Sequence, residues 1–349
     1  MKKRTKKNLK KKEIIFILIS LLVAIIILTT VYFYFEFQPE EVTEESVLYL
    51  GMMVHLESWD EETIDEDLFN RHVEVIRTMA DVFEKYDAKL TFESREQLSQ
   101  GIINWEDNIL QELYDRGHGI GAHADLGGTP IEQGKFIQLL TTRKREMDNL
   151  LTTDVRHVSG ICSENDWVEA TIEAGYEFTT GGVAYCVMSM PEELRPEEYK
   201  NCANPGECHD AFPSEIEDRI HPWRISSGLN WIEEDPDGEL VFFPSSSVLY
   251  NLYEDSLGTA TYGTNAEFTE EDLDEFFIRL DKALTYVDSE QFNMMYFSWS
   301  IGSRERVNNN IDLFEQWFER LQHYIDSGQV EWQTIPGMYD LYLDWEGRQ

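Results

Sequence analysis

The chain has 349 residues, of which 67 are acidic and 29 are lysine or arginine, so its formal net charge is −38. A surface this negative repels polyanions, which argues against nucleic acid as a partner. The length allows one large hydrophobic core or two modest ones.

The amino-terminal segment joins a basic cluster to an apolar run. Residues 1–13 carry eight basic residues and one acidic residue, and the 22 residues from 14 to 35 carry no charge. As a helix this run extends roughly 33 Å, enough to cross a bilayer core. We therefore predict a basic cytoplasmic tail at 1–13, a transmembrane anchor at 14–35 and an acidic stalk at 36–46. The positive-inside rule then places the rest of this single-pass membrane protein outside the cytoplasm.

Two alternatives compete with a membrane anchor. A buried core helix fits poorly, because the run is apolar all round and lies beside a dense basic block. A cleaved secretory signal fits better, but the run is long and its bulky end at 32–35 lacks a small-residue cleavage site.

Beyond the run the chain keeps 66 acidic and 21 basic residues, a net charge near −45.

All the cysteines lie in this predicted outer part, where oxidation is permitted. They are Cys162, Cys186, Cys202 and Cys208. Four cysteines allow three pairings, of which Cys202 with Cys208 is the most local. A zinc-binding loop at 201–209 is the alternative, but the Cys-x-x-Cys spacing of zinc knuckles is absent. The spacing therefore favours a disulfide.

From residue 47 onward, apolar strands alternate with amphipathic helices. We predict strands at 47–56, 89–93, 119–123, 155–161, 176–180, 239–243, 294–299 and 329–334. We predict helices at 67–86, 105–116, 132–151, 165–174, 270–287 and 311–326, and one that begins near 337. A long irregular insert separates the two series at about 182–237.

Strands joined by helix-length connections are parallel. Seven to eight such units predict an α/β fold, a distorted parallel β/α barrel that spans 47–349. The first strand is followed by Glu57-Ser-Trp59 and not by a glycine-rich fingerprint. A nucleotide cofactor is therefore not expected.

Two of the predicted strands end in paired polar side chains. His55 pairs with Glu57, and His123 pairs with Asp125, because side chains two apart on a strand share a face. The carboxyl ends of parallel strands meet at one edge of the sheet, where α/β enzymes place their chemistry. The pattern predicts a metal-assisted active site there.

Four segments carry a resemblance to a known family. Residues 53–59 read MVHLESW, 90–93 read LTFE, 113–123 read LYDRGHGIGAH, and 158–178 read VSGICSENDWVEATIEAGYEF. In this order they resemble the motifs of the polysaccharide deacetylases, which act on chitin, peptidoglycan and related acylated sugars. The resemblance implies a distorted β/α barrel and a metal-dependent deacetylase that acts on the amide bonds of an acetylated polysaccharide or peptidoglycan.

The resemblance also implies roles for single residues. Glu57 matches the metal-binding carboxylate and His123 a metal ligand, while His55 stands where the family has its aspartate base. A bound divalent ion, zinc before cobalt or nickel, would polarise the acyl carbonyl and activate water. His55 is suited to act as the base, or it binds the ion itself.

The chain departs from the family at several positions. Gly127 stands where the family has its second metal-binding histidine. Asp125 is a candidate third ligand, or it caps the turn that follows it. The family's general-acid histidine is missing from residues 296–301, so His221 in the insert is the candidate acid.

Three more residues are candidates for positioning the ligands or contacting substrate: Glu93, Trp59 and Trp223. Two functions remain open. One is an anchored, metal-dependent carbohydrate deacetylase, and the other is a barrel of the same ancestry that binds glycan without turnover.

Overall fold

A computed structural model of the protein describes residues 46–57, 59–128, 131–202, 204, 208–258, 267–301 and 310–348. Among them no helix is long and apolar enough to cross a membrane. The predicted tail, the anchor at 14–35 and the stalk up to residue 45 lie outside the described residues, so these assignments stay predictions. Residues from Ser46 onward form one compact unit.

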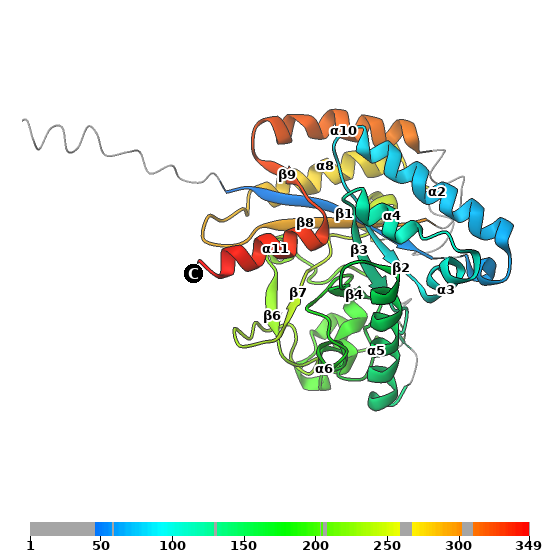
Figure 1. Ribbon diagram of the computed structural model, residues 1–349. Helices are drawn as coiled ribbons and strands as arrows, with labels where there is room; N and C mark the ends of the chain where they lie inside the picture. The colour runs from blue at the N-terminus through cyan, green and yellow to red at the C-terminus, as the bar shows by residue number, and fades with distance from the viewer. Residues whose placement is uncertain are drawn as a thin grey trace, which may run out of the picture. The chain divides into compact units, whose positions relative to one another are not determined.

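A curled sheet of mostly parallel strands is the centre of this unit (Figure 1). Its strands are β1 (Leu48–Leu56), β2 (Thr91–Ser94), β3 (Gly119–His123), β4 (His157–Ser159), β5 (Phe178–Thr179), β6 (Trp223–Ile225), β7 (Leu240–Phe242), β8 (Met294–Ser300) and β9 (Val330–Trp332). Their spatial order is β6-β7-β5-β4-β3-β2-β1-β8, and β9 also pairs with β1. The alternation of strands and helices therefore predicted the parallel series correctly.

The sheet curls far enough for its two ends to approach each other. Val248, just beyond β7, forms a parallel bridge with Ser298 of β8. The backbone amide of Ser246 donates to the carbonyl of Tyr296 at 3.0 Å. These contacts close the gap between β7 and β8, which is consistent with the predicted distorted β/α barrel.

The insert adds one strand that departs from the prediction. β6 comes from the segment predicted to be irregular, and it pairs with β7 in the antiparallel direction. Short 3-10 turns occupy much of the rest: η2 (Ala184–Ser189), η3 (Glu192–Leu194), η4 (Glu197–Tyr199) and η5 (Ile216–Arg219). A three-residue strand lacks the length to show a hydrophobic period, which is why the sequence pattern missed it.

Helices cover the outer face of the sheet. They are α2 (Glu66–Glu84), α3 (Glu96–Trp105), α4 (Ile109–Asp115), α5 (Gln133–Leu150), α6 (Trp167–Glu173), α7 (Leu252–Ser256), α8 (Glu270–Leu284), α10 (Ile311–Asp326) and α11 (Ile335–Glu346), with 3-10 turns η1 (Asp60–Thr63) and η6 (Leu249–Asn251). Figure 1 shows α2, α8 and α10 beside β1 and β8, and α5 with α6 beside β4. Thr269 and Asp272 cap the amino end of α8 as a complete capping box.

Two apolar clusters hold these layers together. The larger one lies between the sheet and the surrounding helices. The smaller one fills the inside of the curl, where Met53 and Tyr296 pack with Tyr339 of α11. Gly121 leaves the space that the imidazole of His157 occupies, because a Cβ there would collide with that ring.

Candidate metal centre and active site

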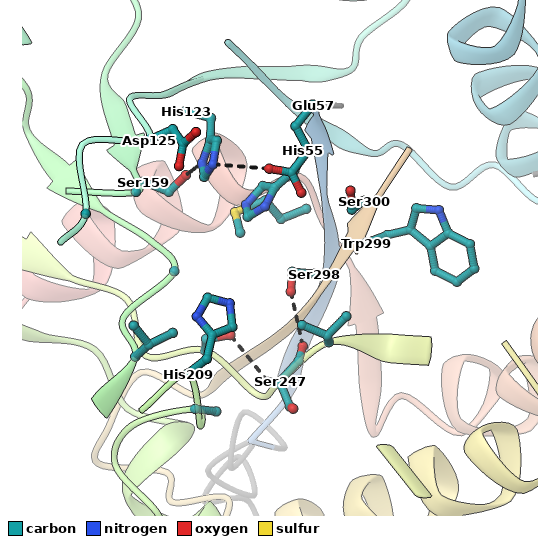
Figure 2. A pocket seen from close by; sticks show the side chains of 18 of the residues that line it. His55, Glu57, His123, Asp125, Ser159, His209, Ser247, Ser298, Trp299 and Ser300 are labelled. Carbon is teal, nitrogen blue, oxygen red and sulfur yellow. Dashed lines mark hydrogen bonds and ion pairs between the residues drawn. The ribbon is translucent and has the colours of Figure 1, made fainter. Parts of the chain in front are cut away.

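A cavity of about 310 Å³ opens at the carboxyl ends of the strands (Figure 2). β1 contributes His55, the residue that follows β1 is Glu57, β3 contributes His123, and the insert contributes His209. Hydroxyl groups line much of the remainder: Tyr185, Ser159, Ser245, Ser247, Ser298 and Ser300. The structure therefore brings the predicted strand-end residues to one cavity, as the parallel arrangement requires.

Glu57 and His123 face each other across this cavity. Their Oε2 and Nε2 atoms are 3.6 Å apart. The other ring nitrogen of His123, Nδ1, lies 2.7 Å from the hydroxyl of Ser159. The resemblance had assigned these two side chains to one metal ion, whereas the strand pattern had paired Glu57 with His55 and His123 with Asp125.

Glu93 is the fully buried carboxylate beneath the cavity. Its Oε1 accepts a hydrogen bond from Thr180 at 2.7 Å and lies 3.1 Å from Nε2 of His157. Its Oε2 accepts from the hydroxyl of Ser159 and lies 3.3 Å from Nε2 of His55. Burial would raise the pKa of this carboxyl, but the two histidines outweigh it and hold the pKa far below its ordinary value. Glu93 is therefore a carboxylate that anchors the site from below.

These hydrogen bonds fix the tautomer of His123. Because the Glu93 carboxylate can only accept, the Ser159 hydroxyl donates to it and accepts from Nδ1–H of His123. The Nε2 lone pair of His123 then faces Glu57. Burial lowers the pKa of His123 to about 3, and the neighbouring His55 acts in the same direction, so the ring is neutral.

Glu57 is ionised opposite this lone pair. Burial would raise its pKa, but the charge of His55, a hydrogen bond from the hydroxyl of Ser300 and the guanidinium of Arg95 lower it below the ordinary value. A carboxylate oxygen and an imidazole lone pair cannot form a hydrogen bond with each other. A cation between them resolves the contact, because zinc binds nitrogen at about 2.0–2.1 Å and carboxylate oxygen at about 2.0–2.2 Å. Two such ligands of one ion fit the separation of 3.6 Å.

His55 is the third member of the donor set. Its ring stacks on that of His123, with centroids 4.2 Å apart. Burial alone would lower its pKa, but the contact with Glu93 outweighs burial and raises it. Within the described part of the chain, His55, Glu93 and His123 place one ligand atom each within 4.8 Å of one another. The residues present thus fit a divalent ion, with Glu57 or Glu93 as the carboxylate.

The availability of the two carboxylates differs. Both oxygens of Glu93 already accept from hydroxyl groups, and its side chain is 0% exposed. Glu57 lines the cavity, and its side chain is 27% exposed. Glu57 is therefore the carboxylate that an ion in contact with substrate would reach.

Asp125 lies at the rim of the cavity. Its carboxylate is 2.8 Å from the guanidinium of Arg95, and half of the side chain is exposed. Its backbone has a φ of 49°, in the left-handed region. The structure thus gives Asp125 a basic partner, and it is not a member of the group of three within 4.8 Å.

His221 and Trp223 are not among the residues that line this cavity. Nδ1 of His221 donates to the carbonyl of Phe292, which precedes β8, so His221 lies at the opposite end of that strand from Ser300. The histidine that the insert brings to the cavity is His209. The structure therefore does not bring the predicted general acid His221 to this cavity, because residues 220 and 221 bond to the backbone at the start of β8.

Trp59 supports the loop that follows Glu57. Its indole donates to the carbonyl of Ile301 at 2.8 Å and stacks on the ring of His72. It does not line the cavity, so its role is to hold the β1 end against the β8 end.

Sequence reasoning missed His209, Ser159 and His157. His209 directly follows Cys208, which pairs with Cys202 in the predicted local disulfide. A second disulfide joins Cys162, at the end of β4, to Cys186 in the insert. The sequence signal that could have identified His209 is its position next to a cysteine predicted to form a disulfide. Ser159 and His157 have no such signal, because their roles come from contacts with residues of other strands.

Comparisons with known proteins support the fold. No protein-family model matches the chain, and no curated protein is significantly similar to it in sequence. The crystal structure of the PuuE allantoinase superposes with a TM-score of 0.51 at 9% identity and covers 83% of this chain and 88% of the allantoinase. This likeness concerns the fold alone.

Other similar structures have lower scores. A putative polysaccharide deacetylase from Mycobacterium smegmatis has a TM-score of 0.48 at 11% identity, covering 87% of this chain and 91% of that one. A CE4 family pseudoenzyme from Bacillus anthracis has a TM-score of 0.37 at 9% identity, covering 84% of this chain and 65% of that one. A polysaccharide deacetylase and a pseudoenzyme are thus among the structures to which the chain is similar.

Proposed function

We propose that the protein is a metal-dependent hydrolase that removes acyl groups from sugars of a cell-envelope or extracellular polysaccharide. The observation that carries the proposal is the Glu57–His123 pair, in which a carboxylate and a neutral imidazole lone pair face each other at 3.6 Å. The pair lies in an open cavity at the carboxyl ends of the strands, lined by hydroxyl groups that suit a sugar. Zinc suits imidazole and carboxylate ligands, and cobalt or nickel are the alternatives.

Each cavity residue has a role in this reaction. Glu57, His123 and His55 would hold the ion, which polarises the acyl carbonyl and lowers the pKa of its water. In the alternative ligand set, Glu93 replaces Glu57 as the carboxylate ligand. Glu57 would then be free to accept the proton of the attacking water. His209 lies on the other side of the cavity from Glu57 (Figure 2), placed to donate a proton to the leaving amine. Burial lowers the pKa of His209, so its ring is neutral near pH 7 and would have to accept a proton before it donates one.

The proposed location of the barrel, outside the cytoplasm, rests on the amino-terminal segment and on the disulfides. The basic cluster and apolar run predict a single-pass anchor with the barrel outside the cytoplasm. Two disulfides, Cys162–Cys186 and Cys202–Cys208, are typical of an oxidising compartment and support this location.

The second candidate function is glycan binding without hydrolysis. Gly127, which lines the cavity, offers no ligand where the resembled family has its second metal-binding histidine. In that case the cavity would hold an acylated sugar through its hydroxyl groups and leave the acyl bond intact.

Metal analysis separates the two functions. The full-length protein, purified in detergent micelles and reconstituted with zinc, cobalt or nickel, should bind one ion and release acetate from chitooligosaccharide or peptidoglycan. Glu57→Gln should reduce occupancy, and Glu61→Gln, an exposed acid nearby, is the matched control. A parallel Glu93→Gln variant identifies the carboxylate. Absence of both bound metal and released acetate would favour the binding function.

A further inference from the structure

A second cavity, of about 760 Å³, lies at the end of β8 opposite to the candidate metal centre. It contains the His221-Pro-Trp223 motif that the first cavity does not use. Two half-buried indoles, Trp223 of β6 and Trp345 of α11, form its sides. Three buried rings lie behind them: Phe212, Phe292 and Tyr342.

The two sides of this far cavity are fixed relative to each other. The guanidinium of Arg224, next to Trp223, binds the carboxylate of Glu346, next to Trp345, with Nη2 and Oε2 2.6 Å apart. The indole of Trp223 donates to the carbonyl of Trp231 at 2.9 Å. The ring of Trp345 packs on Tyr342, with centroids 5.7 Å apart. The aromatic surfaces are therefore in place before a ligand arrives, which reduces the entropy cost of binding.

Acceptor groups dominate the polar lining. Nδ1–H of His221 donates to the carbonyl of Phe292 at 3.1 Å, so its Nε2 lone pair remains an acceptor in the neutral ring. Asp218 and Glu234 add two carboxylates, and no lysine or arginine is among the described residues that line the cavity. Such a lining repels acidic sugars and attracts a ligand that carries hydroxyl donors and a positive charge.

Aromatic faces with nearby carboxylates are a recognised environment for ammonium groups. The flat face of an indole also packs against the apolar face of a pyranose ring. An amino sugar presents both features, and it is the product that N-deacylation leaves on a glycan. We propose that the far cavity binds amine-bearing sugar units of a glycan chain. The choice of an amino sugar as the ligand rests on the proposed function. The aromatic and acidic lining of the cavity is observed independently of that function.

Calorimetry with defined oligomers tests this site. The full-length protein in detergent micelles is titrated with a glucosamine tetramer, with an N-acetylglucosamine tetramer and with tetralysine. We expect the glucosamine tetramer to bind most tightly, and Trp223→Ala or Trp345→Ala to weaken it about tenfold. Tyr114→Ala, which removes an exposed ring on α4, should leave its affinity unchanged.

Three controls make the outcome decisive. Trp345→Phe keeps an aromatic face and should restore most of the affinity, so a folding defect in the alanine variant is recognised. One contrary outcome is that tetralysine binds as tightly as the glucosamine tetramer and loses the same affinity in the tryptophan variants. That result would mean that the cavity recognises positive charge alone, and it would overturn the sugar assignment. Equal binding of the N-acetylated tetramer would overturn the amine assignment.

His123→Ala separates this site from the metal centre. If glucosamine binding persists in that variant and still depends on Trp345, the far cavity stands even where no deacetylation is found. If binding is lost in His123→Ala and unchanged in Trp345→Ala, the ligand occupies the first cavity and the proposal fails.

Discussion

The protein has a closed histidine–glutamate pair, His72 with Glu62, and an open one, His123 with Glu57. The surroundings of the two pairs differ. Nδ1 of His72 lies 2.6 Å from the carboxylate of Glu62, and both side chains are at most 1% exposed. Trp59 stacks on His72, and Trp105 donates to the backbone carbonyl of Glu62. This closed pair forms a hydrogen bond and leaves no room for a ligand.

The His123–Glu57 pair is the open counterpart. Its nitrogen and oxygen are 3.6 Å apart, too far for a hydrogen bond, and both residues line a cavity. Ser159 and Glu93 hold the other nitrogen of His123, so its free lone pair points at Glu57. A histidine and a glutamate that are buried in contact therefore stabilise the fold. The same two residue types, held apart at the wall of a cavity, are available to bind a ligand. Substitutions in the closed pair should therefore lower stability and leave metal binding unchanged, whereas substitutions in the open pair should remove the metal.

The largest effect is expected for His123→Ala. We expect loss of the bound ion and a decrease in deacetylase activity of at least about a thousandfold, beyond the 10–100-fold cost of losing an outer partner of a metal ligand. Metal content and acetate release measure the two losses. His323→Ala, an exposed histidine on α10, is the control. Full metal occupancy in His123→Ala would remove this histidine from the site.

In the closed pair, Glu62→Ala should act on stability. It leaves His72 buried without its carboxylate partner, which costs on the order of 3–5 kcal/mol for a buried pair. Denaturant unfolding of the full-length protein measures this loss. Metal occupancy of the folded fraction should stay the same. A variant as stable as the wild type but depleted of metal would reverse the assignment of the two pairs.

A third pair, His118 with Glu84, adds a pH dependence. Nδ1 of His118 accepts from the amide of Leu90, and Nε2 lies 3.1 Å from the carboxylate of Glu84. Burial, aided by the charge of Lys89, lowers the pKa of His118 to about 4 from 6.5. Between these values the unfolded chain binds a proton that the native state does not. Stability should therefore fall as pH decreases from 6.5 to about 4, by roughly 3 kcal/mol.

His118→Asn should flatten this part of the curve. The amide oxygen of asparagine is able to accept from Leu90 but does not titrate. Unfolding free energies at several pH values between 6.5 and 4 provide the measurement. An unchanged slope in the variant would show that another group is responsible.

The sequence predicted the parts of the site that follow from strand period. Glu57 and His123 line one cavity because each stands at the end of a strand, and parallel strands end together; their roles as metal ligands stay predictions. Glu93 was recognised only as a candidate partner, because its importance depends on Ser159 of β4 and Thr180 beyond β5. Such contacts join residues 66 and 87 positions apart, and no local pattern records them.

The insert was the least predictable region. His209 and His221 lie in the same irregular segment, and only the path of the backbone decides which one reaches the cavity. That path depends on two disulfides and on the short antiparallel strand β6. A three-residue strand carries too little hydrophobic pattern to be predicted from sequence.

Ser159→Ala tests how the open pair is held. Without the hydroxyl, Nδ1–H of His123 loses its acceptor and the link to Glu93 is broken. We expect metal affinity to decrease about 10–100-fold. Nitrogen NMR of the histidine rings should show a loss of the Nδ1–H tautomer of His123. Ser298→Ala, which removes another cavity hydroxyl, should leave both the tautomer and the metal affinity unchanged.

The smallest effect is expected for Asp125→Asn. The carboxylate is half exposed and paired with Arg95, so solvent screens its charge from the open pair. Metal affinity should change by less than about threefold. Calorimetric titration with zinc, beside Glu57→Gln, measures the difference. A loss as large as that of Glu57→Gln would make Asp125 the third ligand, because it would mean that the ion draws this carboxylate away from Arg95 and into the cavity.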